Sequence, residues 1–176
     1  MKFSFNMSGH RRANVWLDEE PPTAYRASSV ESKIVKPRTL IEAKRRIAAV
    51  EVIIAHGARS SYAFLGAELL KADLEGLEVV VSVNKAGAPF AASLAGKLDE
   101  VRIGLPDEYA KAVVSGAVKI AEAVGTPMSR KLWFRWAAHG FVSSSPAIFE
   151  QVSGTVLQLL TLSSAADDQI RALIEQ

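Results

Sequence analysis

Two short stretches of the chain are similar to nucleotide-binding motifs, and each lacks a residue that the chemistry needs. Residues Asn84–Gly87 read Asn-Lys-Ala-Gly, with glycine where a guanine-binding motif needs an aspartate to accept hydrogen bonds from the base. The Gly-Lys pair at 96–97 has Ala91 in place of the first glycine of a phosphate loop and Leu98 in place of its serine or threonine. Without that loop no cradle of backbone amides forms around a phosphate. We therefore expect no nucleotide hydrolysis.

Metal and hydrolytic chemistry have equally little support. His10, His56 and His139 are the only histidines, none stands four residues from another, and the chain has no cysteine, whereas zinc sites use closely spaced His and Cys ligands. No Gly-x-Ser-x-Gly motif occurs, and Ser143–Ser145 are better placed to cap a helix. Glu108 likewise suits the start of a helix rather than the role of a base. We expect a non-enzymatic protein without a cofactor or a bound metal.

A helix, a strand and a second helix are predicted in the second half of the chain. Pro106 suits a first helical position, and Asp107 suits the positive end of the helix dipole. One apolar face of this helix then consists of Tyr109, Val113, Ala117, Ile120 and Val124. The helix ends at Gly125, a strand follows at residues 132–137, and Ser143–Ser145 cap the next helix. Its apolar face consists of Ile148, Phe149, Val152, Val156, Leu159 and Leu160.

The remaining residues are expected to supply a sheet for these helices. Strands are predicted at residues 23–30, 50–55, 62–72 and 77–83. A turn at 73–76 joins the last two strands as an antiparallel hairpin, and residues 40–47 fit either a short helix or a charged strand and loop. Residues 1–20 form an N-terminal arm, in which Val15–Leu17 make a short strand or dock on a sheet edge. Two further segments are expected outside the core. Residues 84–104 form an insertion, and residues 163–176 form a C-terminal tail or short helix. The fold class is α+β, with about four mostly antiparallel strands and two long helices on one face.

Four pieces of the sequence, in order, resemble domain IV of bacterial elongation factor G. They begin at Pro22 (Pro-Thr-Ala-Tyr-Arg), His56 (His-Gly-Ala-Arg-Ser-Ser-Tyr), Leu105 (Leu-Pro-Asp-Glu-Tyr) and Val142 (Val-Ser-Ser-Ser-Pro-Ala-Ile-Phe). The last two are similar to an Ile-Pro-x-Glu-Tyr helix and a Val-Asp-Ser-Ser-x-x-x-Phe helix start in that family. The resemblance covers residues 21–162 and implies the ribosomal protein S5 domain 2-like fold, with a β-α-β crossover of the rarer left hand. It does not include a GTPase domain.

The resemblance also implies a binding tip. In that family two loops form the tip of domain IV, which enters the ribosomal decoding site during translocation. A glycine lets a backbone approach RNA, an arginine binds phosphate or stacks, and aromatic rings offer planar surfaces. The matching residues, expected to contact RNA or the ribosome, are His56, Gly57, Arg59, Ser60, Ser61, Tyr62, His139, Gly140 and Phe141.

The departures from the family fall at this tip. Ala58 replaces a glycine, and Ser60-Ser61 replace Gly-Gln. Ser143 replaces an aspartate, and the tip histidine of the family aligns with Gly140, one residue from His139. The core pattern is therefore kept better than the functional tip. Tyr62 and Phe141 also fit a second interpretation, as strand or core residues.

Charge is distributed unevenly along the chain. Residues 1–60 carry eleven Lys or Arg against six Asp or Glu, although the net charge of the whole chain is only +2. Such a basic half suits a polyanion such as RNA, and equally fits solvated faces. The sequence has no apolar run of membrane-spanning length, so we expect a soluble, cytoplasmic protein without a membrane partner. The expected basic patch consists of Arg26, Lys44, Arg45 and Arg46.

The strand Trp133–Trp136 (Trp-Phe-Arg-Trp) suggests a partner of a different kind. Alternation places Trp133 and Arg135 on one face, and Phe134 and Trp136 on the other. One face packs on the helices, and the other needs cover from the insertion, the arm or a second subunit.

Two main hypotheses for the function follow from the sequence. The chain is a ribosome- or RNA-interacting module in translation, or a protein-interaction or structural module, such as a homodimer, that keeps the fold and has lost the tip function. A third hypothesis, that the chain is a small-molecule enzyme, rests on fold analogy alone.

Overall fold

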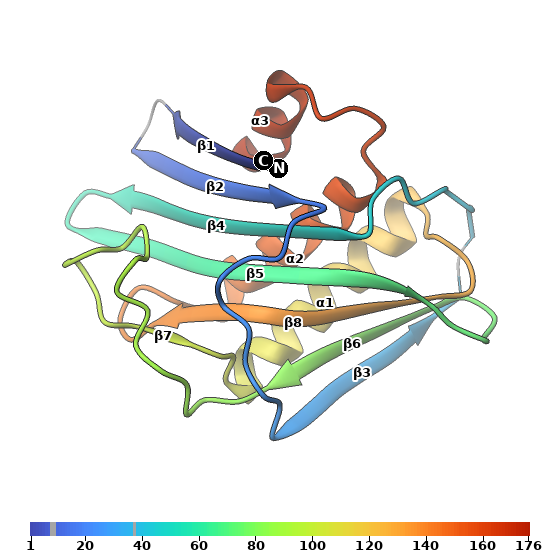
Figure 1. Cartoon of the computed structure of the whole chain (residues 1–176), viewed down its shortest axis with the longest axis horizontal. Coiled ribbons are helices and arrows are strands. Elements are labelled where there is room, and N and C mark those ends of the chain that lie inside the picture. Colours follow the sequence, from blue (N-terminus) through green and yellow to red (C-terminus); the bar gives the residue numbers. More distant parts are fainter. Residues whose placement is uncertain (8–9, 37) are drawn as a thin grey trace.

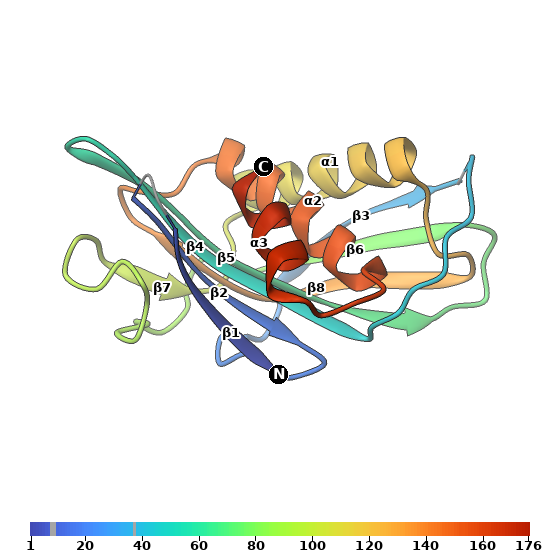
Figure 2. The same ribbon diagram turned by 90° about the horizontal axis from the view of Figure 1, so that it is seen from above.

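The chain builds one mixed sheet with helices against one of its faces (Figures 1 and 2). The computed structural model describes residues 1–7, 10–36 and 38–176. This architecture agrees with the α+β class, although the described residues form eight strands rather than about four. The elements are β1 (Lys2–Met7), β2 (Arg11–Leu17), β3 (Ser29–Val35), β4 (Ile47–His56), β5 (Arg59–Lys71), β6 (Leu77–Val83), β7 (Val101–Ile103), α1 (Asp107–Val124), β8 (Arg130–Gly140), α2 (Pro146–Thr161) and α3 (Asp167–Glu175).

The strands follow the order β1-β2-β4-β5-β8-β6-β3, and the short β7 also pairs with β8. Neighbouring strands are antiparallel, except that β6 and β8 are parallel. The predicted antiparallel hairpin of β5 and β6 is therefore wrong. The turn at residues 73–76 does connect these two strands, but each pairs with β8, because α1 returns the chain to the space between them.

The connection from β6 through α1 to β8 is left-handed. In Figure 1 both strands point to the left, β8 lies above β6, and α1 lies behind the sheet. Figure 2 shows the same helix on the same face, seen from above. Parallel β-α-β connections are right-handed in nearly all proteins. The left hand is thus a specific feature of this chain.

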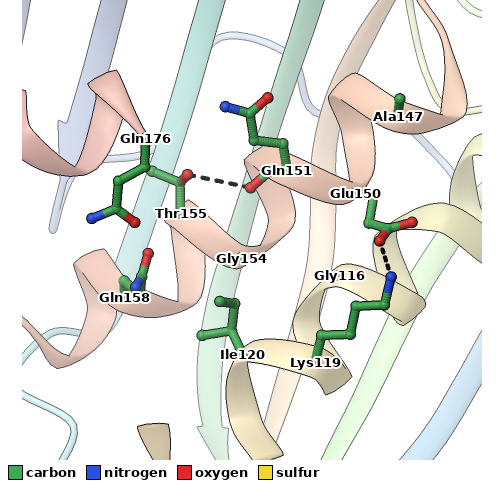
Figure 3. A pocket seen from close by; sticks show the side chains of 10 residues that line it. All are labelled: Gly116, Lys119, Ile120, Ala147, Glu150, Gln151, Gly154, Thr155, Gln158 and Gln176. Carbon is green, nitrogen blue, oxygen red and sulfur yellow. Dashed lines mark hydrogen bonds and ion pairs between the residues drawn. The ribbon is translucent and has the colours of Figure 1, made fainter. Parts of the chain in front are cut away.

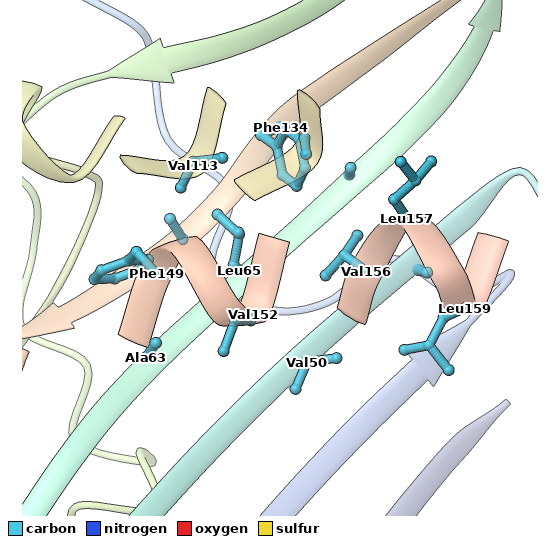
Figure 4. Packing of buried hydrophobic residues seen from close by; sticks show 14 of the residues in the cluster. Val50, Ala63, Leu65, Val113, Phe134, Phe149, Val152, Val156, Leu157 and Leu159 are labelled. Atoms are coloured by element: carbon cyan, nitrogen blue, oxygen red, sulfur yellow. The ribbon is translucent and has the colours of Figure 1, made fainter. Parts of the chain in front are cut away.

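The two long helices follow the apolar spacing of the sequence, and both predictions are confirmed. α1 begins after Pro106 with Asp107 and Glu108 in its first turn, where their charges complement the helix dipole. α2 begins after Ser145, whose side chain accepts a hydrogen bond from the backbone N–H of Ile148 at 3.4 Å. Figure 4 shows side chains of α2 gathered with those of β4 and β5 in the main core, among them Phe149, Val152, Val50, Ala63 and Leu65.

The two helices approach each other closely at a glycine. A Cβ atom on Gly116 would lie 2.0 Å from the backbone oxygen of Glu150, so the helices meet at their backbones. On the outer side the crossing leaves a groove of about 390 Å³ (Figure 3). Lys119 and Glu150 form an ion pair within it. The charges that line the groove therefore largely neutralise each other.

Residues 1–20, predicted as an arm, contribute two strands of the sheet instead. β1 and β2 form an antiparallel hairpin, and β2 pairs with β4 along its whole length. Alternate residues of β2, namely Ala13, Val15 and Leu17, are buried in the main core. The C-terminal segment packs here as α3, and the guanidinium of Arg11 donates a hydrogen bond to the backbone oxygen of Ile174. Burial of apolar surface on alternate positions is the reason that β2 joins the sheet.

The strand predicted at residues 23–30 lies further along the chain, as β3. Residues 21–28 instead run across the face of the sheet that is opposite the helices, in front of β5 and β8 in Figure 1. Ala24 makes an isolated bridge to Trp136 on the way. The predicted strand at 50–55 is confirmed as part of β4, and the one at 62–72 is confirmed as β5 except for its last residue.

The insertion and residues 40–46 are mostly irregular. Residues 40–46 form neither the helix nor the strand considered from the sequence, apart from an isolated bridge at Leu40. Residues 84–104 include β7 and pack on the face opposite the helices. There Phe90 and Leu94 join a second hydrophobic cluster around Phe64. The insertion therefore supplies the cover that this face of the sheet needs.

Candidate nucleic-acid interface

The two predicted tip loops lie side by side at one end of the sheet. β4 ends at His56, β5 begins at Arg59, and the loop between β8 and α2 runs next to them. The backbone N–H of Tyr62 donates to the backbone oxygen of Ser143 at 3.0 Å, and the Ser144 hydroxyl donates to the backbone oxygen of Tyr62 at 2.7 Å. Residues 93–99 of the insertion complete this end of the molecule. We call the combined surface of residues 56–61, 93–99 and 140–144 the tip.

The tip encloses a cavity and exposes large side chains around it. The cavity has a volume of about 420 Å³ and is lined by Arg59, Leu98 and Asp99 among others. Phe141 is 84% exposed and Val142 81% exposed. Arg59 is also exposed and forms no ion pair with any described residue. An unpaired guanidinium near an exposed loop that carries one aromatic ring is a surface that suits RNA, because the cation binds phosphate and the ring stacks on a base.

Asp99 of the insertion organises the loop that carries Phe141. Its carboxylate accepts hydrogen bonds from the backbone N–H of Ser143 at 2.8 Å, from the Ser143 hydroxyl, and from the backbone N–H of Val142 at 3.1 Å. Partial burial opposes ionisation of Asp99, but these hydrogen bonds outweigh it and lower its pKa. Asp99 thus fixes the backbone of Val142 and Ser143.

The stability that Asp99 contributes should depend on pH. Its folded pKa lies below the ordinary value of 3.8, so the unfolded chain binds the proton more readily. The contribution is complete above the ordinary pKa and is lost as the pH falls through the lower folded pKa. We expect the difference in urea midpoint between the wild type and Asp99→Asn to be constant above about pH 5 and to shrink below about pH 4. A difference that grows on acidification would contradict the role of Asp99.

Three of the predicted tip residues face inward. Tyr62 is fully buried, its hydroxyl donates to Glu51 at 3.0 Å, and burial raises its pKa. Gly140 is buried as well, and a Cβ atom on it would lie 2.2 Å from the Asp99 carboxylate. His139 is half-buried, and its Nδ1 lies 2.9 Å from the backbone oxygen of Gly104. Burial lowers the pKa of His139, so its ring is less prone to carry a charge. Tyr62 thus follows the second interpretation, as a core residue, and these three offer little surface to a ligand.

The remaining predicted residues lie at or beside the opening of the tip. His56, Gly57 and Arg59 are exposed, and Ser60 and Ser61 are half-buried. Gly57 has a φ of 63°, a left-handed conformation that glycine adopts without strain, and it makes the tight hairpin turn. The alternative that Phe141 is a core residue is wrong, since it is among the most exposed side chains.

The sequence did not indicate that the N-terminal hairpin reaches the same end. His10 and Arg12 line a neighbouring cavity of about 270 Å³, which shares Ser60 and Leu98 with the tip cavity. Arg12 donates a hydrogen bond to the backbone oxygen of Leu94 in the insertion at 2.9 Å. The alternation of buried residues in β2 was the one signal for this placement, because it makes residues 11–17 a strand beside β4.

The residues of the expected basic patch do not form one surface. Arg26 lies in the segment that crosses the sheet, where its backbone oxygen accepts a hydrogen bond from Asn84. Residues 44–46 precede β4 and so lie at the opposite end from the tip. Each of these three forms an ion pair, with Glu42, Asp18 and Glu68 respectively. They therefore cannot extend a basic surface from the tip.

The aromatic strand is covered within the chain. The prediction that Trp136 lies on the same face as Phe134 is wrong, because a bulge in the pairing of β5 with β8 shifts the alternation there. The Arg135 guanidinium lies 4.5 Å from the ring centroid of Trp133 and 5.1 Å from that of Trp136, which places all three on the face opposite the helices. Trp136 is 1% exposed, and the Trp133 Nε1 donates to the Ser82 hydroxyl at 2.9 Å. A second subunit is not required to cover these rings.

Comparison with known proteins assigns no relative to the chain. Neither the protein-family models nor the curated proteins include a match. Within the described residues, no group of three or more His, Asp or Glu side chains is arranged to hold a metal ion. No helix of the described structure has the length and apolar character needed to cross a membrane.

Proposed function

We propose that this chain is a non-catalytic RNA-binding module that contacts the ribosome in the cytoplasm through its tip. The observation that carries the proposal is the junction of the Arg59 hairpin with the exposed Phe141 loop around one cavity. The resemblance to domain IV of elongation factor G adds support, since the same two loops form the tip in that family. The left-handed β6–α1–β8 connection supports the S5 domain 2-like fold that the resemblance implies.

The groups at the tip suit single-stranded or looped RNA. The Arg59 guanidinium can bind a phosphate or stack on a base, and the Phe141 ring offers a planar surface. Gly57, at the turn, allows a backbone to approach closely. A base splayed out of a loop would reach these groups more readily than one inside a regular RNA helix, whose deep groove excludes side chains.

The proposal is limited to binding, because the tip is built differently from that of the resembled family. The loop of Phe141 is held by Asp99 of the insertion rather than by an aspartate of its own. His139 is half-buried and bonded to the backbone oxygen of Gly104. A contact with ribosomal RNA requires only the exposed side chains of the tip.

The test is co-sedimentation of the purified protein with ribosomes and separated subunits across a salt series. We expect binding to weaken as salt is raised, because phosphate contacts release counterions. Arg59→Ala should weaken binding and reduce the salt slope by about one. Phe141→Ala should weaken it by about tenfold without changing the slope, since stacking contributes about 1–3 kcal/mol per base.

The matched control is Lys33→Ala, which removes one exposed positive charge from β3 at the far edge of the sheet. It should leave binding at the wild-type level. Absence of binding at low salt would overturn the proposal, as would equal effects of Arg59→Ala and Lys33→Ala.

A second candidate function is a protein-interaction module, including a homodimer. One observation favours it: β3 is an edge strand, and its Val30 and Ile34 are 56% and 57% exposed. Unpaired strand edges with apolar side chains pair readily with another chain. A stable dimer together with no ribosome binding at any salt concentration would select this function over the first.

A further inference from the structure

Another cavity lies at the opposite end of the sheet from the tip. It has a volume of about 340 Å³, and five of its lining residues are cationic, while the others are apolar. The cationic residues are Lys44, Arg45, Arg46, Lys71 and Arg130. We call it the basic cavity. The thirteen residues of β5, which run from the tip to this cavity, span about 40 Å, so no single small ligand contacts both.

Two of these cations are placed directly against each other. Lys71 is the register partner of Arg130 on the neighbouring antiparallel strand. Neither forms an ion pair with any carboxylate of the described residues. Like charges directly opposite on neighbouring strands destabilise a sheet. An anion between them would turn that repulsion into attraction.

Arg45 adds a hydrogen-bond donor without a partner. Its side chain is only 11% exposed, and its Nη1 lies 3.1 Å from the Asp18 carboxylate. Its Nε is buried and has no hydrogen-bond partner among the described residues. The backbone N–H groups of Lys44 and Arg45 both donate to the backbone oxygen of Leu160 at the end of α2. This segment is therefore held in place by the helix layer, and the orientation of the guanidinium is fixed before any ligand binds.

The carboxylates near the cavity neutralise only part of its charge. Glu42 pairs with Lys44, and Asp18 pairs with Arg45. Glu68 lies between Arg46 and Arg135. Lys71 and Arg130 thus remain as the cations that face the hollow with no carboxylate of their own.

We propose that the basic cavity binds a phosphate group, carried either by a free phosphorylated compound or by the backbone of an RNA. Planar guanidinium groups bind phosphate oxygens in pairs, and an ammonium group adds a point charge beside them. The site stands on its own residues and does not depend on the proposed function of the tip.

The experiment measures binding of inorganic pyrophosphate by calorimetry to the whole chain. The Lys71→Gln/Arg130→Gln double variant should bind it at least about tenfold more weakly than the wild type, because two charge-assisted contacts are lost. Without ligand, that variant should melt at the wild-type temperature or above it, since the repulsion between the two strands is removed. Its folding is therefore not at risk. The control Lys33→Gln/Lys85→Gln removes two exposed charges elsewhere and should bind as the wild type does.

A short single-stranded RNA, tested on a background that lacks Arg59 and Phe141, distinguishes the two sources of phosphate. Binding that is lost with Lys71→Gln/Arg130→Gln identifies the RNA backbone as the source. Binding of pyrophosphate without binding of this RNA identifies a free phosphorylated compound. Equal pyrophosphate affinity in the wild type and the double variant would overturn the proposal, and so would failure of the wild type to bind either probe.

Discussion

Gly116→Ala should lower the free energy of unfolding by about 2 kcal/mol, within the usual cost of overpacking. The added Cβ atom would lie 2.0 Å from the backbone oxygen of Glu150 and 2.2 Å from the Ser153 hydroxyl. A backbone oxygen cannot rotate away, so α1 and α2 have to separate. Alanine is the better helix former by about 1 kcal/mol, which offsets only part of the cost. The expected fall in Tm is about 4–8 °C.

Gly154→Ala is the matched control on the other helix. There the added Cβ atom would lie 2.7 Å from Cγ1 of Ile120. Ile120 is half-buried and borders the groove between the helices (Figure 3), so its side chain has room to move outward. The gain in helix propensity should roughly offset this shift, leaving a change within about 0.5 kcal/mol. Thermal unfolding followed by circular dichroism measures both variants. Equal effects of the two substitutions would show that the close approach at Gly116 does not limit the helix packing.

The helices were predictable because their signals are local. Pro106, Asp107 and the apolar face from Tyr109 onward lie within one stretch, and so do Ser145 and the face that follows it. The pairing of β6 was not predictable in this way. A turn at residues 73–76 favours a hairpin, but the partner of both β5 and β6 is β8, which comes some fifty residues later in the chain. No local pattern carries that information.

In the candidate site, too, the features with local signals were predictable and those that depend on distant residues were not. The exposure of Arg59 and Phe141 follows from hairpin and loop positions that the sequence marks. Tyr62 is buried because Leu94 and Ala95 of the insertion pack in the same hydrophobic cluster. The position of the Phe141 loop depends on Asp99, which lies in the same segment, and this segment has no regular periodicity. The alternation of apolar and polar residues along a strand shows that the two faces of the sheet differ. It does not show which residues of a distant loop will cover either face.

Glu51 is a buried residue of the sheet that contacts the insertion, whose Asp99 in turn binds the Phe141 loop. It is 1% exposed and accepts hydrogen bonds from the side-chain amide of Asn14 at 2.9 Å, the Tyr62 hydroxyl at 3.0 Å and the backbone N–H of Leu94 at 2.7 Å. The contact with Leu94 ties the insertion to β4. Asp99 lies five residues further on, so the position of the Phe141 loop depends on this buried carboxylate.

Glu51→Ala should therefore destabilise the protein by about 3 kcal/mol, because it leaves buried donors without an acceptor. We expect Tm to fall by about 6–12 °C. We also expect trypsin to cleave the folded protein faster after Lys97, because the insertion loses its tie to the sheet.

Glu51→Gln is the control. Its amide oxygen can still accept hydrogen bonds from Tyr62 and Leu94, so most of the stability and of the protection from trypsin should remain. If both variants lose stability equally, the negative charge of Glu51, rather than its hydrogen bonds, holds the insertion. If neither variant exposes the insertion to trypsin, the apolar contacts of Phe90 and Leu94 alone are sufficient to hold it on the sheet.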